Sequence, residues 1–213
     1  MSGASFPLVA VYADESCLGN GREGDNPGGA GALIEFRTGS GTVIRRDLWV
    51  SERATTNNRM ALRSVIEVFR ALSVKRHRLR VIFTTDSNYI VKGMSEWYHG
   101  WVQKSWRTRN GPVLNQELWV EAAAAIGGHE VQWRWVRGHD SHPQNEYAND
   151  LAIRAARELS NLEGLVESEF DSWLAAKRAK GRMPKPADPF PDSAKFRAAR
   201  PLPGAVGTRH FHE

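Results

Sequence analysis

The chain has 213 residues, of which 41% are hydrophobic, and carries a formal net charge of +5 at pH 7. This length fits one domain with an appendage, and the basic charge favours an anionic partner, with nucleic acid as the first candidate. The single cysteine excludes an internal disulfide framework and a multi-cysteine zinc site, and without a long apolar run or a signal-like start we expect a cytoplasmic protein that does not enter a membrane.

Three strands are predicted in the first quarter of the chain. Residues 8–14, LVAVYAD, form a β-rich run that ends in an acid, as expected of a buried strand with a polar group at its tip. A connection rich in Gly, Asp and Asn (19–31) then leads into two further strand-like runs, AGALIEF and TVIRRDLWV. The segment RTGSG between those runs is typical of a hairpin turn.

The middle of the chain alternates helices with strands. Apolar residues recur every three or four positions over residues 57–72, which predicts an amphipathic helix packed on a sheet. There follow a strand, a short helix, a tryptophan-rich basic segment, a helix, a strand and a helix, over residues 80–86, 87–94, 96–112, 114–126, 130–136 and 142–160. This mixed order predicts an α/β fold with one five-stranded mixed sheet and helices on both faces, rather than a doubly wound parallel sheet.

The composition changes after about residue 160. Apolar residues at helical spacing predict an amphipathic C-terminal helix over 161–182, which becomes basic toward its end. Six of the ten prolines lie between residues 181 and 213, where large apolar residues are few. We therefore expect a domain over 1–160, the C-terminal helix, and a flexible tail over 183–213 that is disordered or loosely draped.

Three aspartates are placed where they can meet. Asp14 and Asp86 close two predicted strands, and parallel neighbouring strands would bring both carboxylates to one edge of the sheet, where Asp150 can also point. Converging acids without compensating bases are unfavourable unless a divalent cation lies among them, and oxygen-only ligands favour Mg²⁺ or Mn²⁺. Two such ions about 4 Å apart would activate water and stabilise the leaving oxygen in phosphodiester cleavage. The alternative is that strand-end aspartates only cap loops.

Five short motifs stand out by their order and spacing. They are DESCLGN from Asp14, TTNNRM from Thr55, TDS from Thr85, WVRGH from Trp135, and NE from Asn145 together with Asp150. Over residues 8–160 they resemble the type-one branch of ribonuclease H, a family that cuts the RNA strand of RNA–DNA hybrids with two magnesium ions held by Asp, Glu, Asp and Asp. The resemblance implies a ribonuclease H-like fold, Mg²⁺ or Mn²⁺ as cofactor and an RNA–DNA hybrid as partner, and nothing requires more than a monomer.

The resemblance also assigns roles to single residues. It implies that Asp14, Asp86 and Asp150 are catalytic metal ligands, and that His139 is the histidine that assists proton transfer or product release. Substrate contacts are implied for Cys17, Asn20, Thr56, Asn57, Asn58, Asn88, Trp97, Trp101, Lys104 and Arg107. The last four belong to the tryptophan-rich segment, which matches the family's basic protrusion. The alternatives are a surface loop histidine at 139, a buried structural thiol at 17 and core packing for some of the tryptophans.

One position departs from the family pattern. Ala61 stands where the family has its metal-binding glutamate. Glu15 is the nearest new acid in the sequence, but side chains alternate along a strand, so its carboxylate is expected to point away from that of Asp14 unless the strand end bends. Either Ala61 is an engineered substitution, or it is native to a branch in which Glu15, a water or the RNA phosphate replaces the lost ligand.

These patterns predict a metal-dependent endonuclease that hydrolyses the RNA strand of RNA–DNA hybrids, with activity reduced by the missing glutamate. The alternative from another class is a protein that binds RNA–DNA hybrids or double-stranded RNA and cleaves weakly or not at all. A second enzymatic alternative is a related nuclease that acts on another nucleic acid.

Overall fold

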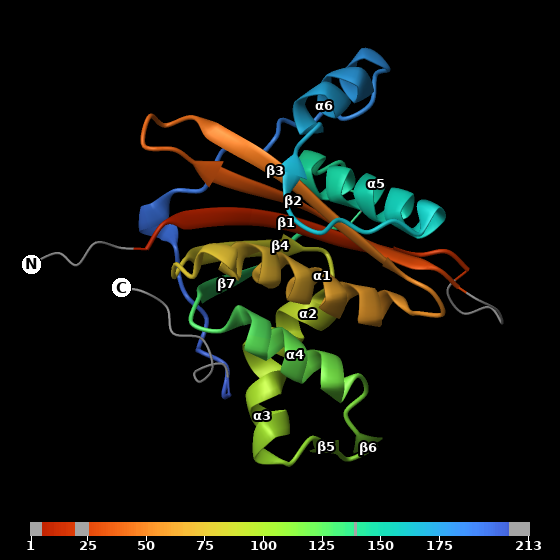
Figure 1. The fold of residues 1–213 in the computed structure, drawn as a ribbon, viewed down its shortest axis with the longest axis vertical. Coiled ribbons are helices and arrows are strands. Elements are labelled where there is room, and N and C mark those ends of the chain that lie inside the picture. The colour runs from red at the N-terminus through yellow and green to blue at the C-terminus, as the bar shows by residue number, and fades with distance from the viewer. Residues whose placement is uncertain (1–5, 20–25, 139, 205–213) are drawn as a thin grey trace, which may run out of the picture.

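A six-stranded mixed sheet forms the centre of the chain (Figure 1). The computed structural model describes residues 6–19, 26–138 and 140–204. Five strands are the predicted ones: β1 (Leu8–Cys17), β2 (Gly28–Arg37), β3 (Val43–Glu52), β4 (Arg80–Thr85) and β7 (Glu130–Trp135). The sixth, β8 (Val166–Glu167), pairs with the outer edge of β3. The order is β7-β4-β1-β2-β3-β8, in which β1, β4 and β7 run parallel while the other neighbours run antiparallel.

Helices cover both faces of the sheet, as predicted (Figure 1). One face carries α1 (Asn57–Leu72), α2 (Asn88–Lys92) and α4 (Gln116–Ile126), and the other carries α5 (Pro143–Glu158). The 3₁₀ turn η1 (Ser73–Lys75) follows α1. Helix α1 begins where the pattern predicts because the Thr56 hydroxyl caps it, and its apolar residues at three- and four-residue spacing are buried in the main core. In the described part of the chain, every helix is too short or too polar to cross a membrane.

Glycines on β2 let α5 approach the sheet closely. A Cβ atom on Gly29 would lie 2.1 Å from the carbonyl oxygen of Ala152, and one on Gly31 would lie 2.4 Å from that of Ala148. Gly31 is also the residue of β2 that pairs with Asp14 of β1. The missing side chains therefore let α5 lie directly over the strand end that carries Asp14.

Adding one methyl group at Gly31 is expected to destabilise the fold. The Cβ of a Gly31→Ala variant meets helix backbone, which cannot move aside like a flexible side chain, so we expect the free energy of unfolding to fall by about 1–3 kcal/mol. The matched control is Gly39→Ala in the β2–β3 turn, where no atom lies within 4 Å of the new Cβ. Urea unfolding measures both, and equal midpoints for the two variants would contradict the close packing of α5.

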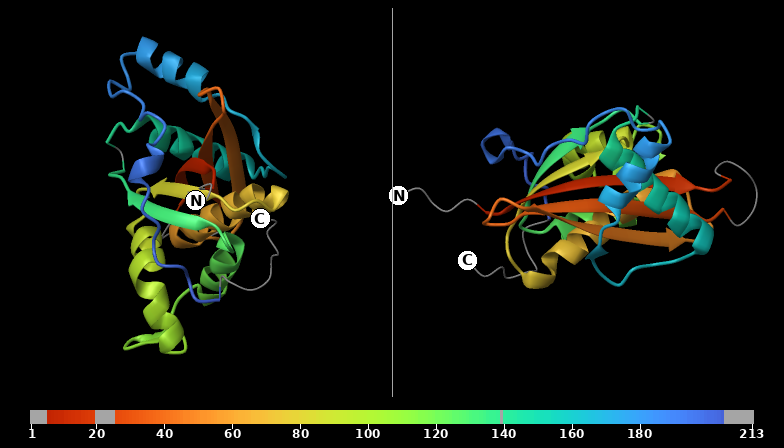
Figure 2. Two further views of the ribbon diagram at one scale, coloured as in Figure 1. Left: turned by 90° about the vertical axis from the view of Figure 1, so that its left-hand side faces the viewer. Right: turned by 90° about the horizontal axis from the view of Figure 1, so that it is seen from above.

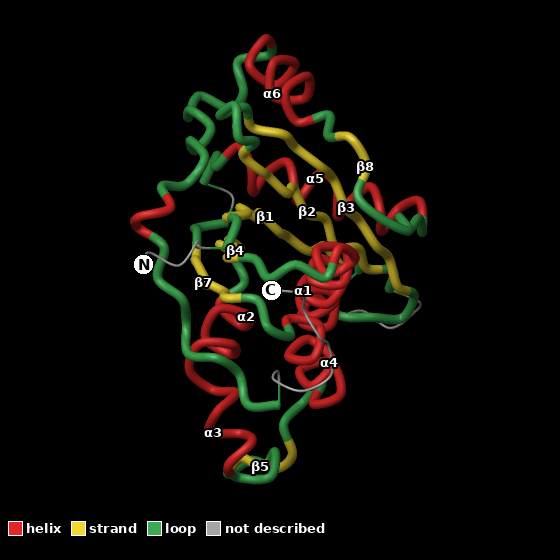
Figure 3. Tube along the Cα trace, turned by 60° about the vertical axis from the view of Figure 1, so that its left-hand side comes forward, coloured by secondary structure: helices red, strands yellow, loops and turns green. Residues whose placement is uncertain are grey.

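A projection extends from the α1 face, away from the sheet (Figure 3). It contains the π-helical η2 (Gly93–Trp97), α3 (Tyr98–Gln103) and the small hairpin of β5 (Arg107–Thr108) and β6 (Gly111–Pro112). We call residues 96–112 the basic protrusion. Trp119 of α4 anchors it, because its indole lies directly on Gly93, where a Cβ atom would come within 2.0 Å of the ring.

The C-terminal helix is shorter than predicted. A helix over 161–182 is predicted, but residues 161–169 form a loop and β8, and the helix α6 runs only from Phe170 to Ala179. Of the tail predicted to be disordered or loosely draped, residues 183–204 lie along the domain without regular secondary structure apart from one 3₁₀ turn, and residues 205–213 lie outside the described residues.

We call residues 183–204 the C-terminal strap, which includes the 3₁₀ turn η3 (Ser193–Lys195). It passes beside β7 at the edge of the sheet (Figure 2). The Ala199 N–H donates to Val131 O of β7 (2.7 Å), and the strap ends with Leu202 buried in the main core. Prolines exclude a regular helix here, but they allow an extended chain that hydrogen-bonds to the rest of the domain.

Candidate active site

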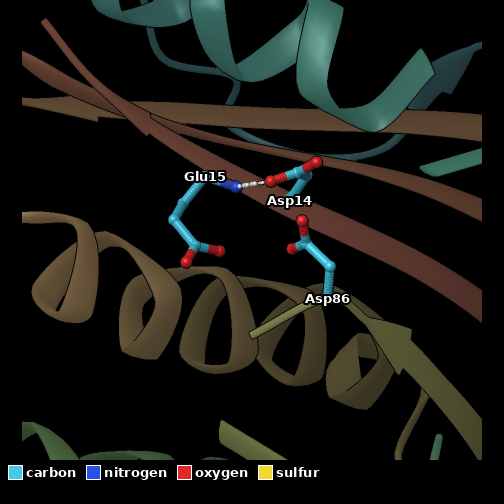
Figure 4. A group of neighbouring side chains, drawn as sticks. All are labelled: Asp14, Glu15 and Asp86. Atoms are coloured by element: carbon cyan, nitrogen blue, oxygen red, sulfur yellow. Dashed lines mark hydrogen bonds between the residues drawn. The ribbon is translucent and has the colours of Figure 1, made fainter. Parts of the chain in front are cut away.

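The candidate active site lies where β1 extends beyond the end of its neighbour β4. The last residue of β4, Thr85, pairs with Ala13 of β1, whereas β1 continues to Cys17 and pairs there with β2 alone. The edge of β1 that faces β4 is therefore open from Asp14 onward, and Asp86 follows directly after β4. One carboxylate oxygen from each of Asp14, Glu15 and Asp86 lies within 4.8 Å of the other two (Figure 4).

Glu15 joins this cluster although the side chains alternate along the strand. Asp14 is turned toward α5, whose Asn145 donates a hydrogen bond from Nδ2 to Asp14 Oδ2 (2.9 Å), while Glu15 is directed at α1 (Figure 4). The carboxylates still meet because no neighbouring strand separates them at the open edge, and Asp86 extends between them. The Glu15 side chain thus leaves the strand on the opposite face from Asp14, as alternation predicts, but its carboxylate still reaches the cluster.

Helix α1 brings no acid of its own to this end of the sheet. Ala61 lies in its second turn with no exposed surface. The Cys17 thiol donates to Thr55 O (3.4 Å), which ties the end of β1 to the residues before α1. Burial raises the pKa of this thiol, in agreement with a structural role for Cys17 in addition to the implied substrate contact.

Two of the three acids, Asp14 and Glu15, have pKa values raised by their surroundings. Burial, followed by the charge of Asp86, raises the pKa of Asp14 to about 8, although the Glu15 N–H and Asn145 both donate hydrogen bonds to it. The pKa of Glu15 is raised well above its ordinary value by burial, then by Asp14 and by Asp86. Three carboxylates at this separation repel one another when they are ionised, so a cation placed among them would stabilise the cluster.

Two buried oxygen atoms of the site lack hydrogen-bond partners and indicate what kind of ligand the site would bind. Oε2 of Glu15 and Oδ1 of Asn145 are shielded from solvent and have no hydrogen-bond partner within the described part of the chain. Buried polar atoms without partners are costly and call for an explanation such as an ion or water. An all-oxygen donor set of this charge fits a hard divalent cation.

The structure does not bring Asp150 into this cluster, which corrects the prediction of three converging aspartates. Its Oδ2 accepts a hydrogen bond from Trp173 Nε1 (2.8 Å) and forms an ion pair with Lys177 Nζ (2.8 Å), both on α6. Asn145 faces Asp14, and Asp150 is five residues further, about 140° away around the helix. Asn149 is one turn beyond Asn145, only about 40° away, and is therefore on the side of α5 that faces the acids.

Two further predicted residues, His139 and Asn20, lie outside the described residues. The loop before His139 approaches the cluster, because a Cβ atom on Gly138 would lie 2.1 Å from Asp86 Oδ2. Trp135, at the end of β7, donates from Nε1 to Asp86 O (2.9 Å) and is 46% exposed. This contact links β7 to the turn that carries Asp86.

The predicted polar contacts lie around the same end of the sheet. Thr56 caps α1, with its hydroxyl accepting from the Arg59 N–H. Asn57 has a buried Oδ1 without a hydrogen-bond partner within the described chain, whereas Asn58 at the start of α1 and Asn88 at the start of α2 are exposed. The amides of Asn58 and Asn88 are therefore open to a ligand, whereas the amide oxygen of Asn57 is not.

The tryptophans of the basic protrusion divide into two kinds. Trp101 is half-buried and packs against Trp119 with 5.1 Å between ring centroids, so it belongs mainly to the core. Trp97 is 37% exposed, and Lys104 and Arg107 project into solvent. The protrusion therefore presents the exposed ring of Trp97 and three exposed cations, Lys104, Arg107 and Arg109, on a packed base.

Comparison with known proteins agrees with this geometry. The RNase H family model matches residues 7–157. The chain is 41% identical to the ribonuclease H of Pseudomonas entomophila over 152 residues, covering 71% of this chain and 95% of that protein. It is 42% identical to the ribonuclease HI of Neisseria meningitidis serogroup B over 153 residues, covering 71% of this chain and 97% of that protein.

A solved structure extends the similarity beyond the family match. The crystal structure of LC9-RNase H1, described as a type 1 RNase H with the type 2 active-site motif, is 56% identical to this chain. The two superpose with a TM-score of 0.88, and the match covers 98% of this chain and 99% of that one. The similarity therefore includes the C-terminal region that lies outside residues 7–157.

Proposed function

We propose that this chain, which belongs to the ribonuclease H family and to its type-one branch, hydrolyses the RNA strand of RNA–DNA hybrids with Glu15 in place of the family's helical glutamate. The observation that carries this assignment of the site is the clustering of the carboxylates of Asp14, Glu15 and Asp86 within 4.8 Å. Oε2 of Glu15, which is buried and has no hydrogen-bond partner among the described residues, supports the same assignment. Ala61 is then the native residue that accompanies Glu15, because a further carboxylate at position 61 would add negative charge to a site that already has three acids.

The cofactor that fits the cluster is Mg²⁺ or Mn²⁺, held by Asp14, Glu15 and Asp86. When bound, such an ion lowers the pKa of a coordinated water and stabilises charge on the scissile phosphate. The chain's own residues prepare for this, because Asn145 holds the Asp14 carboxylate and Trp135 holds the backbone at Asp86. We assign the fourth position of the site to Asn149, whose amide oxygen is a neutral donor on the facing side of α5.

The substrate surface follows from the exposed groups around the acids. The exposed amides of Asn58 and Asn88, together with the half-buried Asn57, are suited to the sugar edges of a minor groove, where the 2′-hydroxyl distinguishes RNA from DNA. Lys104 and Arg107 of the basic protrusion are suited to phosphates of the DNA strand, and the exposed ring of Trp97 adds a stacking surface.

The substrate class is tested by incubating labelled RNA–DNA hybrid with the chain and Mg²⁺ or Mn²⁺, alongside DNA duplex and RNA duplex of the same sequence. Cleavage of the RNA strand in the hybrid, with both control duplexes intact, is the expected result. Tight binding of the hybrid without cleavage in either ion would instead identify a binding protein. Equal cleavage of the RNA duplex would place the chain among nucleases of broader specificity.

Without a metal ion, the protein is expected to lose stability as the pH rises from about 4 to about 8. The pKa of Asp14 is about 8 in the folded chain and 3.8 in the absence of these surroundings. Between these values the folded chain keeps a proton that the unfolded chain has released, so the stability present below pH 3.8 is lost as the pH rises through about 8. Thermal melts in EDTA across this range measure the decline.

Two controls isolate the cause of this decline. The Asp14→Asn variant carries no titrating group there, so its melting temperature is expected to fall less with pH. Mg²⁺ is expected to raise the melting temperature of the unmodified chain most at the high end of the range, because it binds the deprotonated acids. The same EDTA slope in Asp14→Asn as in the unmodified chain would exclude the cluster as its origin.

A further inference from the structure

Asp188 fastens the C-terminal strap to the start of α5. Its N–H donates to Gln144 Oε1 (3.1 Å), and its carbonyl oxygen accepts from Gln144 Nε2 (2.9 Å). Gln144 has no exposed surface, so this amide pairs with the strap backbone inside the protein. The Asp188 carboxylate also pairs with Arg134 of β7 through Oδ2 (2.9 Å).

The same carboxylate reaches the histidine that caps α5. Oδ2 of Asp188 lies 3.3 Å from Nε2 of His142, the N-cap residue. On the other side of the ring, Nδ1 accepts a hydrogen bond from the Asn145 N–H (3.3 Å). Since Nδ1 is an acceptor, the neutral ring must carry its proton on Nε2 and donate it to Asp188. Asp188 thus favours the tautomer that can cap the helix.

The residue capped in this way is the one that holds Asp14. Asn145 is 2% exposed, and while its N–H donates to His142, its side-chain Nδ2 donates to Asp14 Oδ2. A continuous series of hydrogen bonds therefore runs from Asp188 of the strap through His142 and Asn145 to Asp14. A second contact, from Lys185 Nζ to Asp140 Oδ2 (2.8 Å), ties the strap to the loop before α5.

We propose that Asp188 is a positioning residue of the nuclease site, which acts through the His142 tautomer and Asn145 to hold the Asp14 carboxylate in place. This inference rests on the proposed function. The physical need is clear, because Asp14 is close to two other acids, and an ionised carboxylate under repulsion keeps its orientation only if a fixed donor holds it. The strap lies beyond residues 7–157, so this part of the site's support comes from outside the segment that the family model matches.

The first test compares two acids of the strap on the full-length chain. Asp188→Ala removes the acceptor for His142 and is expected to lower kcat on RNA–DNA hybrid about tenfold, at the lower end of the effect of outer partners in metal sites, with KM within about twofold. The matched control is Asp192→Ala, whose carboxylate caps only the local turn at the Ala194 N–H (2.9 Å) and should leave kcat unchanged. An unchanged kcat in both variants, or a rise in KM alone for Asp188→Ala, would overturn the proposal.

A double-mutant cycle tests the route through His142. Asn is itself a good helix cap, so His142→Asn retains a cap for the Asn145 N–H but no longer depends on a tautomer. In this background, adding Asp188→Ala is expected to change kcat by less than about twofold, since the two residues act in one series. If Asp188→Ala lowered kcat tenfold in both backgrounds, Asp188 would act by another route. This result would refute the proposed relay, by which we mean the series of hydrogen bonds from Asp188 through His142 and Asn145 to Asp14.

A spectroscopic measurement tests the role of Asp188 independently of the nuclease activity. Nitrogen NMR of the His142 ring in the unmodified chain is expected to show the proton on Nε2 at neutral pH, and Asp188→Asn, which retains an acceptor oxygen, should preserve this tautomer. A proton on Nδ1 would refute the relay even if the chain cuts hybrid normally. Conversely, the expected tautomer in a chain that cuts no hybrid would leave the relay standing and reject the proposed function, so the two failures are distinguishable.

Discussion

Replacing Glu15 with glutamine is expected to lower kcat on RNA–DNA hybrid by about 10²- to 10³-fold, the loss typical of one electrostatic catalytic group. The amide keeps the size of the side chain but removes one negative charge from a cluster that includes Asp14 and Asp86. The control is Glu163→Gln, an exposed acid in the loop before β8, which should cut at the unmodified rate. Steady-state cleavage of labelled hybrid measures both variants.

The role of position 61 can be tested by moving the carboxylate. In a Glu15→Ala/Ala61→Glu double variant the acid comes from α1, as in the family pattern, and we expect activity to recover at least tenfold over Glu15→Ala. Ala61→Glu alone is expected to be less stable than the unmodified chain, because position 61 has no exposed surface and the site already contains three acids. Full activity in Glu15→Gln, or cleavage by Ala61→Glu alone among all forms, would show that Glu15 does not replace the lost ligand.

The second large effect on kcat is expected on α5, where substitutions of two neighbouring residues should change the rate to very different extents. Asn149→Ala is expected to lower kcat by about 10- to 100-fold, because it removes the proposed fourth donor. Asp150→Asn is the matched control: its carboxylate binds Trp173 and Lys177 on α6, and the amide retains an acceptor for the indole. We expect its rate to stay within about twofold of the unmodified chain, with a small loss of thermal stability. The reverse ranking of the two variants would restore Asp150 as the ligand.

The sheet and its main helices could be predicted because their patterns are local. The apolar spacing over 57–72 matches α1, and the five strands that surround the core were all recognisable from β-rich runs and their flanking turns. The two-residue β8 has no pattern of its own and exists only because the β3 edge is available. The helix predicted over 161–182 is shorter because residues 161–169 form a loop in which Val166 and Glu167 pair with β3.

The errors at the site come from contacts between distant segments. Alternation correctly sends Glu15 to the opposite face from Asp14, but the sequence does not say that β4 ends one residue before the acids and leaves the edge open. Asp150 fits the motif spacing approximately, and its rejection requires knowing that α6 packs beside it. The signal that could have found Asn149 was helical geometry, because it is one turn from Asn145. The contacts of the strap were not predicted because proline content indicates the backbone conformation of a segment but not its tertiary contacts.

The early end of β4 has a consequence for how this chain tolerates change. Asp14 and Glu15 lie on β1, and Asp86 directly follows the adjacent strand β4, so the backbone hydrogen bonds between these two strands set the spacing of the acids. A helix can tilt or slide when its packing residues are exchanged, whereas paired strands keep their register. Substitutions on the buried face of α1 can therefore change the stability of the protein without changing the distances between its clustered acids.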